Sequence, residues 1–306
     1  MRAAVCTRYG PPEVLRLEDV AEPVPRGNDL RIRISATAVT SSDCYVRGLD
    51  LSPAYKLMAR IALGWSAPRR RILGMVLSGT VDAVGPECRT FRVGDEVLGF
   101  NRHLFGTYAE YVCWPEDGLI VLRPPELTHD VAAALPYGGL LAMHSLRRGG
   151  LSRGQKVLVY GASGAVGTCA VQLATHFGAE VTGVCGPSNL DLVRSLGATS
   201  VIDYTTGEMW EDGVAYDLIL DAVGKRKSAT AMRQSARALA AGGHSISVDD
   251  GTPKLRRDDL AIVADLAACG ASLPVVDRTF ELADIAEAHR YVGNGHKRGN
   301  VVIAVA

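Results

Sequence analysis

Short apolar runs separated by glycine and proline fill the first third of the 306-residue chain. Apolar or alternating runs of this length, bounded by turn residues, predict β-strands. The predicted strands are Leu30–Ala36, Met75–Val84, Asp95–Gly99 and Tyr108–Val112. We therefore expect a β-rich first domain that ends near the Pro124–Pro125 pair, where the pattern changes from short β-type runs to alternating strands and helices.

Beyond that pair, apolar strands alternate with stretches of helical character. The predicted strands are Lys156–Tyr160, Glu180–Val184, Ser200–Asp203, Asp217–Asp221 and His244–Val248. The predicted helices are Gly164–Phe177, Asn189–Leu196, Ser228–Leu239 and Asp258–Ala268, and the tail adds a helix at Leu282–Val292 and a strand at Val301–Val305. Mostly apolar strands in such an alternation predict a parallel sheet covered by helices on both faces, an α/β fold.

Charge and cysteine usage narrow the class of protein. The 33 basic residues balance the 33 acidic ones, which gives no electrostatic reason to expect a nucleic acid or an acidic membrane as partner. The first residues lack the apolar core of a signal peptide, and no later run is long enough to span a bilayer. Seven scattered cysteines without a CxxC pair fit reduced thiols. We expect a cytoplasmic protein that acts on a small molecule.

The most informative motif is a glycine triplet between a predicted strand and a predicted helix. Gly161, Gly164 and Gly167 have the GxxGxxG spacing. The first glycine allows a tight turn, the second lets the backbone approach a pyrophosphate, and the third lets the helix pack closely on its strand. Glycines also serve ordinary turns, but the strand before, the helix after and a second strand beyond favour a dinucleotide site.

The end of that second strand predicts which dinucleotide binds. An NAD enzyme places an acidic residue there for the ribose 2′-hydroxyl, whereas this chain has no carboxylate before Asp191. Gly186 leaves room for a 2′-phosphate, and Ser188 and Asn189 could donate hydrogen bonds to it. Ser188 could instead cap the following helix in a capping box with Asp191. Both interpretations stay open, and the missing acid predicts NADP(H).

With these motifs in place, the sequence resembles the zinc-independent, quinone-oxidoreductase-like branch of the medium-chain dehydrogenase/reductase superfamily. The matching segments are Tyr9–Leu15, Ser42–Gly48, Gly79–Gly85, Gly94–Val97, Ala109–Val112, Gly161–Gly167 and Ala288–Tyr291. The resemblance implies a GroES-like β-rich domain at 1–122, completed by 272–306, and a Rossmann NADP(H)-binding domain at 123–271. Substrate and cofactor would meet in the cleft between them, which a loop at Asp50–Arg71 would cover.

The resemblance also implies individual roles. Tyr45 matches a tyrosine that lines the active site, and Tyr204 matches one that contacts the adenosine phosphate. The candidate cofactor-binding residues are Gly161, Ser163, Gly164, Ala165, Val166, Gly167, Cys185, Gly186, Ser188, Asn189, Tyr204, Val223 and Asn300. The chain departs from the family pattern where Leu190 and Asn300 replace lysines, Leu141 replaces a threonine, and Thr40 or Ser41 replaces an asparagine; Lys297 and Arg298 lie close to Asn300 in sequence.

The zinc enzymes of this superfamily need thiolate and imidazole ligands that this chain lacks. Thr40 and Gly74-Met75-Val76 occupy the expected positions, and Cys44 stands on the wrong side of Asp43, where it is expected to be a packing residue. The four-cysteine structural zinc loop is absent as well. Without a Lewis acid, reduction of an electrophilic quinone or enone is easier than oxidation of an alcohol. Tyr45 would then donate a proton to the resulting enolate, or only shape the pocket.

Two further functions and one assembly state follow from the same residues. The chain could be an enoyl-thioester reductase or cyclising enzyme, or a non-catalytic NADP(H) sensor, which Leu141 and Asn300 would favour. The last predicted parallel strand, His244–Val248, is followed by a charged, proline-containing connection and then the Asp258–Ala268 helix. The edge strand through which superfamily members usually dimerise is therefore expected to be missing. We predict a monomer, or a dimer through another surface.

Overall fold

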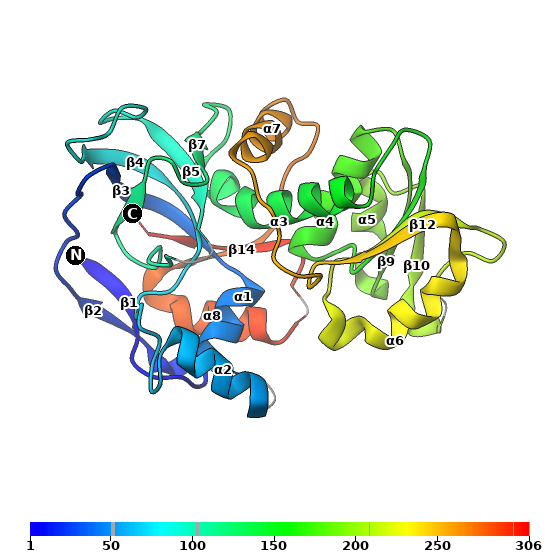
Figure 1. Ribbon diagram of the computed structural model, residues 1–306, viewed down its shortest axis with the longest axis horizontal. Coiled ribbons are helices and arrows are strands. Elements are labelled where there is room, and N and C mark those ends of the chain that lie inside the picture. The colour runs from blue at the N-terminus through cyan, green and yellow to red at the C-terminus, as the bar shows by residue number, and fades with distance from the viewer. Residues whose placement is uncertain (50–52, 102–103, 208, 296, 306) are drawn as a thin grey trace. The chain divides into compact units, whose positions relative to one another are not determined.

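The computed structural model describes residues 1–49, 53–101, 104–207, 209–295 and 297–305. It contains two compact units, Met1–Pro136 with Val276–Ala306 and Tyr137–Val275 (Figure 1). We call them the first and the second unit. The domain limits expected from the sequence stay a prediction, and the elements below are described within these units.

The first unit is built on a largely antiparallel sheet. Among the described residues its strand order is β13-β14-β3-β4-β5-β7, with β6 also paired to β3 and a separate β1–β2 hairpin. The strands are β1 (Arg2–Cys6), β2 (Leu15–Asp19), β3 (Asp29–Val39), β4 (Val76–Val84), β5 (Glu96–Phe100), β6 (Tyr111–Pro115), β7 (Ile120–Leu122), β13 (Val276–Glu281) and β14 (Asn300–Ala304). The helices are α1 (Ser41–Gly48), α2 (Pro53–Leu63) and α8 (Ile285–Gly293), with short 3-10 turns η1 (Pro12–Val14) and η5 (Leu282–Asp284). Leu30, Ile32 and Ile34 of β3 are fully buried and form part of the core.

Three predictions for this unit were wrong in detail. The Asp50–Arg71 segment contains α2 rather than only a loop, and its first residues, 50–52, lie outside the described residues. The tail has two strands instead of one, because β13 pairs in parallel with β14 across α8. The strand expected at Tyr108–Val112 begins only at Tyr111, because the Tyr108 N–H donates to Leu73 and its carbonyl accepts from Ala4 of β1.

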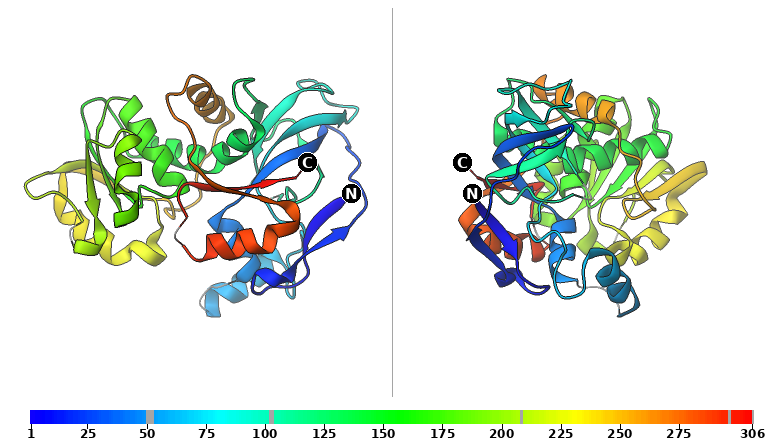
Figure 2. Two further views of the ribbon diagram at one scale, coloured as in Figure 1. Left: turned by 180° about the vertical axis from the view of Figure 1, so that it is seen from behind. Right: turned by 60° about the vertical axis from the view of Figure 1, so that its left-hand side comes forward.

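The second unit is built on a parallel sheet (Figures 1 and 2). Its strand order is β10-β9-β8-β11-β12. The strands are β8 (Lys156–Tyr160), β9 (Glu180–Cys185), β10 (Ser200–Asp203), β11 (Tyr216–Asp221) and β12 (Leu239–Ser247). The helices are the end of α3 (His129–Arg148), α4 (Ala165–His176), α5 (Leu190–Ser195), α6 (Lys225–Ser235) and α7 (Arg257–Ala268), with 3-10 turns η2 (Pro187–Asn189), η3 (Tyr204–Thr206) and η4 (Ala236–Ala238). From β8 the chain moves to β9 and β10 on one side and to β11 and β12 on the other, so right-handed crossovers place the helices on both faces.

The predicted fold class, a doubly wound parallel sheet plus a β-rich part, is confirmed. Helix α3 was not predicted, and the helix expected at Ser228–Leu239 ends earlier, because β12 already begins at Leu239. Residues 248–256, all of them described, contain no strand, as expected from their charge and proline. The parallel sheet therefore ends at β12. Within the described part of the chain, no helix has the length and apolarity needed to cross a bilayer.

Candidate coenzyme and catalytic sites

The glycine turn at the carboxyl end of β8 has little room for side chains. Gly161 has φ +79°, and a Cβ there would lie 2.4 Å from Cγ2 of Val223. A Cβ on Gly167 would lie 2.1 Å from the Gly161 carbonyl oxygen, so only glycine allows α4 to pack this closely on the turn. At Gly164 the conformation is ordinary, and a Cβ would meet nothing nearer than that oxygen, at 3.5 Å. Glycine is thus required at Gly161 and Gly167 for different steric reasons, and of the three only Gly164 has free space beside it.

Helix α4 begins directly after this turn. Its N-cap, Gly164, supplies no side-chain cap, so the N–H groups at the start of the helix remain available to a ligand. Ala165 and Val166 form its first turn. The hydroxyl oxygen of Ser163 accepts a hydrogen bond of 3.4 Å from Nδ2 of Asn189, which links the turn to the end of β9. A helix start of this kind suits the pyrophosphate of a dinucleotide.

The end of β9 lies beside η3. Cys185 is buried, and burial raises the pKa of its thiol to about 11, so it stays protonated at neutral pH. A Cβ on Gly186 would lie 3.6 Å from the ring of Tyr204, an ordinary contact. Asn189 has a buried amide oxygen without a hydrogen-bond partner, which a ligand hydroxyl could satisfy. Helix α5 begins at Leu190 with Asn189 as its N-cap, so Ser188 lies in η2 and the capping interpretation is wrong.

Asp221, which is not among the candidate site residues, shapes the neighbouring turn. It is fully buried at the carboxyl end of β11 and accepts hydrogen bonds from the N–H groups of Val223 and Gly224 and from the hydroxyls of Ser228 and Ser247. The network holds Val223 beside Gly161. An acidic residue directly after the apolar run Leu218–Leu220 was the signal that could have found it.

Asn300 is the one candidate cofactor residue outside the second unit. It is a buried residue of β14 and belongs to the first unit, whereas the other twelve candidate cofactor residues belong to the second. Leu141 lies on α3 in the second unit, where it lines a small cavity together with His144, Ile246 and Val248. The described structure therefore brings together the glycine turn, the end of β9, Tyr204 and Val223.

In the first unit, a buried hydrogen-bond network fixes helix α1, which carries Tyr45. Thr40 and Asp43 form a capping box, in which the Asp43 N–H donates to the Thr40 hydroxyl and the Asp43 carboxylate accepts from the Thr40 N–H. The same carboxylate accepts a hydrogen bond of 2.6 Å from the Thr40 hydroxyl and one of 3.2 Å from the Gly74 N–H. Tyr45 is 37% exposed. Asp43 thus ties the start of α1 to the segment before β4 and positions Tyr45.

The surroundings of Asp43 are unusually polar for a core. Burial raises the pKa of Asp43 to about 6, although hydrogen bonds from Thr40 and Gly74 oppose the rise. Burial and the nearby Asp43 charge raise the pKa of Tyr108 well above its usual range. Burial, with the charge of Arg47, lowers the pKa of His289 to about 3, so this imidazole is neutral at physiological pH.

Cys44 contacts that imidazole. Its sulfur lies 3.5 Å from Nδ1 of His289, and the thiol also points to the His289 carbonyl, at 3.8 Å. The positions that hold zinc ligands in the zinc enzymes carry the buried side chains of Thr40, Met75 and Val76. Among the residues that the structure describes, no group of three or more His, Cys, Asp or Glu could hold a metal ion. Cys44 has the environment of a half-buried packing thiol beside His289.

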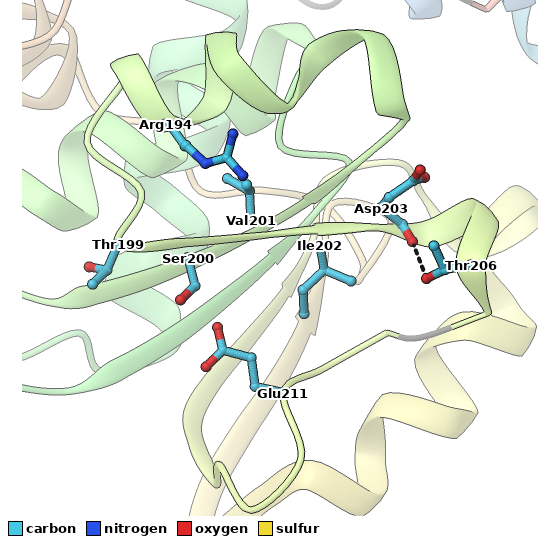
Figure 3. Close-up of a pocket in the computed structure, with 8 residues that line it drawn as sticks. All are labelled: Arg194, Thr199, Ser200, Val201, Ile202, Asp203, Thr206 and Glu211. Carbon is cyan, nitrogen blue, oxygen red and sulfur yellow. Dashed lines mark hydrogen bonds between the residues drawn. The ribbon is translucent and has the colours of Figure 1, made fainter.

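A separate hollow of about 460 Å³ lies along the edge strand of the parallel sheet (Figure 3). Residues of β10 and its neighbours line it, among them Arg194, Ser200 and Glu211, and the Thr206 hydroxyl donates to the Asp203 carbonyl at its rim. None of the candidate site residues lines it. It reflects the uncovered edge of β10, and we assign it no function.

Comparisons with known proteins agree with this architecture. Residues 26–124 match the model of the alcohol dehydrogenase GroES-like domain, and residues 165–287 match that of the zinc-binding dehydrogenase. The mouse (Mus musculus) protein NAD(P)H oxidoreductase RTN4IP1, mitochondrial, is 32% identical over 100% of this chain and 89% of its own length. The tomato (Solanum lycopersicum) 2-methylene-furan-3-one reductase is 31% identical over 99% of this chain and 79% of its own length.

A solved structure gives the same picture. The quinone oxidoreductase from Coxiella burnetii superposes with a TM-score of 0.87 at 26% identity, covering 100% of this chain and 99% of that one. The fold is thus that of a nicotinamide-dependent oxidoreductase family with a GroES-like part. The chain belongs to the medium-chain dehydrogenase/reductase superfamily, in its quinone-oxidoreductase-like branch, which confirms the resemblance drawn from the sequence.

Proposed function

We propose that this protein is a zinc-independent, NADPH-dependent reductase of quinones or of activated C=C bonds such as those of enones. The observation that carries the proposal is the glycine turn, where a Cβ on Gly167 would lie 2.1 Å from the Gly161 carbonyl while Gly164 stays open. The names of the relatives, which include an NAD(P)H oxidoreductase and an NADPH-dependent alkenal/one oxidoreductase of Arabidopsis thaliana, support the same chemistry.

The residues of the second unit fit a dinucleotide. The N–H groups at the start of α4 would bind its pyrophosphate, with the Gly164 surface leaving the backbone accessible. The unpartnered amide oxygen of Asn189 would accept a hydrogen bond from a ribose hydroxyl. Gly186 and Tyr204 would flank the 2′-phosphate, and the lack of a carboxylate between Cys185 and Leu190 avoids charge repulsion with it. These residues therefore favour NADPH over NADH.

A bound nicotinamide coenzyme supplies a hydride to an electron-poor carbon. We propose that the Tyr45 hydroxyl then donates its proton to the enolate or hydroquinone anion that results, and regains a proton from water. The capped, buried start of α1 fixes the backbone that carries this side chain, because the buried Asp43 carboxylate accepts three hydrogen bonds, two from Thr40 and one from Gly74. Polarisation by zinc has no part in this proposal, since threonine, methionine and valine side chains stand at the expected ligand positions.

Turnover with purified protein tests the proposal. NADPH oxidation would be followed with quinones, free enones and enoyl thioesters, alongside elemental analysis of protein prepared without chelator. We expect oxidation with a quinone or a free enone and substoichiometric zinc. NADPH binding without turnover on any substrate would favour a sensor, activity confined to thioesters would favour the biosynthetic alternative, and stoichiometric zinc would contradict the zinc-free mechanism.

We also propose that the chain does not dimerise through its parallel sheet. The sheet ends at β12, and the described residues 248–256 add no strand beyond it. The connection that follows carries charged residues and Pro253, which makes a poor pairing template. Light scattering is expected to give the mass of a monomer, or of a dimer joined through another surface. A two-fold dimer with a continuous sheet across this edge would contradict the proposal.

A further inference from the structure

Helix α2 and the turn after it expose large apolar side chains. Leu57, Met58, Ile61 and Trp65 are 49%, 69%, 61% and 64% exposed. At about 100° per residue, the three helical ones lie within an arc of about 100° on one side of α2. Isolated exposed apolar residues are common, but a row of four in nine residues marks a contact surface. We call the segment 56–71 the basic apolar segment.

The same segment concentrates positive charge. Residues 51–81 contain no Asp or Glu, and they include Lys56, Arg60, Arg69, Arg70 and Arg71. In the described part of the chain, none of these five forms an ion pair with a carboxylate, and the Arg60 guanidinium instead lies 6.0 Å from the ring centre of Trp65. The whole chain is neutral, so this charge is a local excess. Carboxylates of the described residues do not neutralise it, and the Arg69 guanidinium only donates to the Ile61 carbonyl at 3.1 Å, so the charge can face an external anionic surface.

The backbone of the segment is fixed, so the exposure of its side chains is built into the fold. The Tyr9 hydroxyl donates to the Gly64 carbonyl at 2.9 Å, and the Cys6 N–H of β1 donates to the Arg71 carbonyl at 2.7 Å. The Arg69 N–H donates a hydrogen bond to the carbonyl of Leu63, the last residue of α2, and so fixes the turn after the helix. Helix α2 lies at the margin of the first unit in Figures 1 and 2, and among the described elements no helix or strand packs extensively on it.

We propose that the basic apolar segment docks the protein onto an anionic lipid surface. A short amphipathic helix with exposed Leu, Met, Ile and Trp and flanking Lys and Arg can lie in the plane of the headgroups, and its 11 residues are too few to span a bilayer. The earlier expectation of no membrane partner rested on the summed charge of the chain, which does not register a local excess. The docking does not depend on the proposed function, although a lipophilic quinone or enone would be met at such a surface.

Charge decides between a lipid surface and a second copy of the chain. A symmetric contact through this segment would bring five unneutralised cations of one copy against five of another, which is repulsive. Anionic headgroups neutralise the same cations while the acyl region accepts the apolar side chains. The segment thus fits an acidic lipid surface better than self-association.

Flotation with lipid vesicles tests the docking. We expect binding to phosphatidylcholine vesicles that contain phosphatidylglycerol, little binding to pure phosphatidylcholine, and release by sodium chloride. Each basic residue near such a surface contributes roughly five-fold, so Arg69→Gln, Arg70→Gln and Arg71→Gln together are expected to lower the affinity by about 100-fold. Leu57→Ser, Met58→Ser and Ile61→Ser together are expected to abolish flotation at moderate salt.

Matched controls use exposed residues elsewhere on the first unit. Arg16→Gln, Arg89→Gln and Arg92→Gln together remove the same charge, and Val93→Ser removes an exposed apolar side chain; both are expected to leave vesicle binding unchanged. NADPH oxidation with a water-soluble quinone is measured on every variant. Because the Asp50–Arg71 segment is expected to cover the substrate cleft, flotation and turnover are scored separately on the wild-type protein and on the control with Arg16, Arg89 and Arg92 changed. Either proposal can then fail without the other.

Trp65 reports insertion directly. Brominated lipids in anionic vesicles are expected to quench its fluorescence, and Trp65→Phe is expected to remove that quenching, since Trp114 is fully buried and Trp210 is half-buried. Failure of the wild-type protein to float with anionic vesicles would overturn the proposal. So would a dimer in light scattering that the Leu57, Met58 and Ile61 changes dissociate, because a second copy would then cover the segment.

Discussion

The glycine turn of the second unit and helix α1 of the first unit solve the placement of a functional group in opposite ways. The turn works through its backbone, since Gly161 and Gly167 are needed because they have no side chain. A Cβ at Gly167 would clash with the Gly161 carbonyl oxygen. Helix α1 works through side chains, since Thr40 and Asp43 hold its start and Asp43 reaches back to Gly74.

This difference determines what a substitution does at each place. In a backbone site, adding atoms causes damage, and the damage is steric and local. In a side-chain network, removing atoms causes damage, and it spreads to every group that shared the buried hydrogen bonds. The two regions can therefore be separated by mutations of opposite kinds.

The largest expected effect tests helix α1, which carries the proposed proton donor Tyr45. Tyr45→Phe keeps the ring and removes the hydroxyl, so a proton donor at this position predicts a fall in kcat of about 10²–10⁴-fold. Tyr111→Phe on β6 removes a hydroxyl in the same unit and is the control. Steady-state kinetics with NADPH measure both, and a loss of only a few-fold for Tyr45→Phe would leave it as a pocket wall.

The second prediction separates two glycines of one turn. Gly167→Ala places a Cβ against the Gly161 carbonyl and is expected to lower stability by about 2–3 kcal/mol and to abolish tight coenzyme binding. Gly164→Ala has space, so it should leave the unfolding free energy nearly unchanged and weaken only coenzyme affinity. Denaturant unfolding and coenzyme titration measure the two effects, and equal stability losses would mean that the turn is not held as described.

The third prediction sharpens the specificity of the backbone site. Gly186 has φ −77°, and a Cβ there makes only an ordinary contact with Tyr204, so Gly186→Asp should fold normally. Its carboxylate would repel a 2′-phosphate, and we expect NADPH affinity to fall about 10- to 100-fold while NADH affinity changes little. Gly186→Asn is the neutral control. Equal affinity of the unmodified protein for both coenzymes would contradict the phosphate pocket.

The smallest effect concerns the polar core behind α1. Burial lowers the pKa of His289 to about 3 in the folded chain. Below about pH 6.5 the imidazole is therefore protonated in the unfolded chain but stays neutral in the folded chain. Stability is therefore lost as the pH falls below 6.5, by about 1 kcal/mol between pH 7 and 5.5. Asp43, whose pKa is raised, opposes this over part of the range.

The control for that prediction is His289→Gln. It removes the proton uptake while Asp43, Cys44, Tyr108 and Arg47 remain. Denaturant unfolding of both proteins at pH 7 and 5.5 measures the difference between their pH dependences. If the two curves fall in parallel, His289 is not buried in the neutral form.

The sequence predicted the backbone features well, because they depend on neighbouring residues. The strand, glycine turn and helix from Lys156 to His176 form one continuous motif, and the parallel strands follow from short apolar runs. The absence of a strand after β12 could also be predicted, since charge and proline act locally. The roles of the candidate site residues stay predictions.

Features that depend on distant partners could not be predicted. Helix α3 contains Pro136, Gly138 and Gly139, which argue locally against a helix. These glycines serve packing, because a Cβ on Gly138 would lie 2.3 Å from the Ala165 carbonyl oxygen and one on Gly139 would lie 2.5 Å from Val263. Asp43 and Asp221 share this character in part, since each combines local partners with a distant one, Gly74 for Asp43 and Ser247 for Asp221.

The position of β14 has a consequence for the order of folding. This strand lies between β13 and β3, and Val301 pairs with Val39, so the sheet of the first unit is closed by residues made after the entire second unit. During synthesis the second unit can complete its parallel sheet while β3 still lacks one neighbour. The unit that leaves the ribosome first is thus the last to finish, and until then the Ala36–Val39 part of β3, which β6 does not cover, presents an unpaired edge.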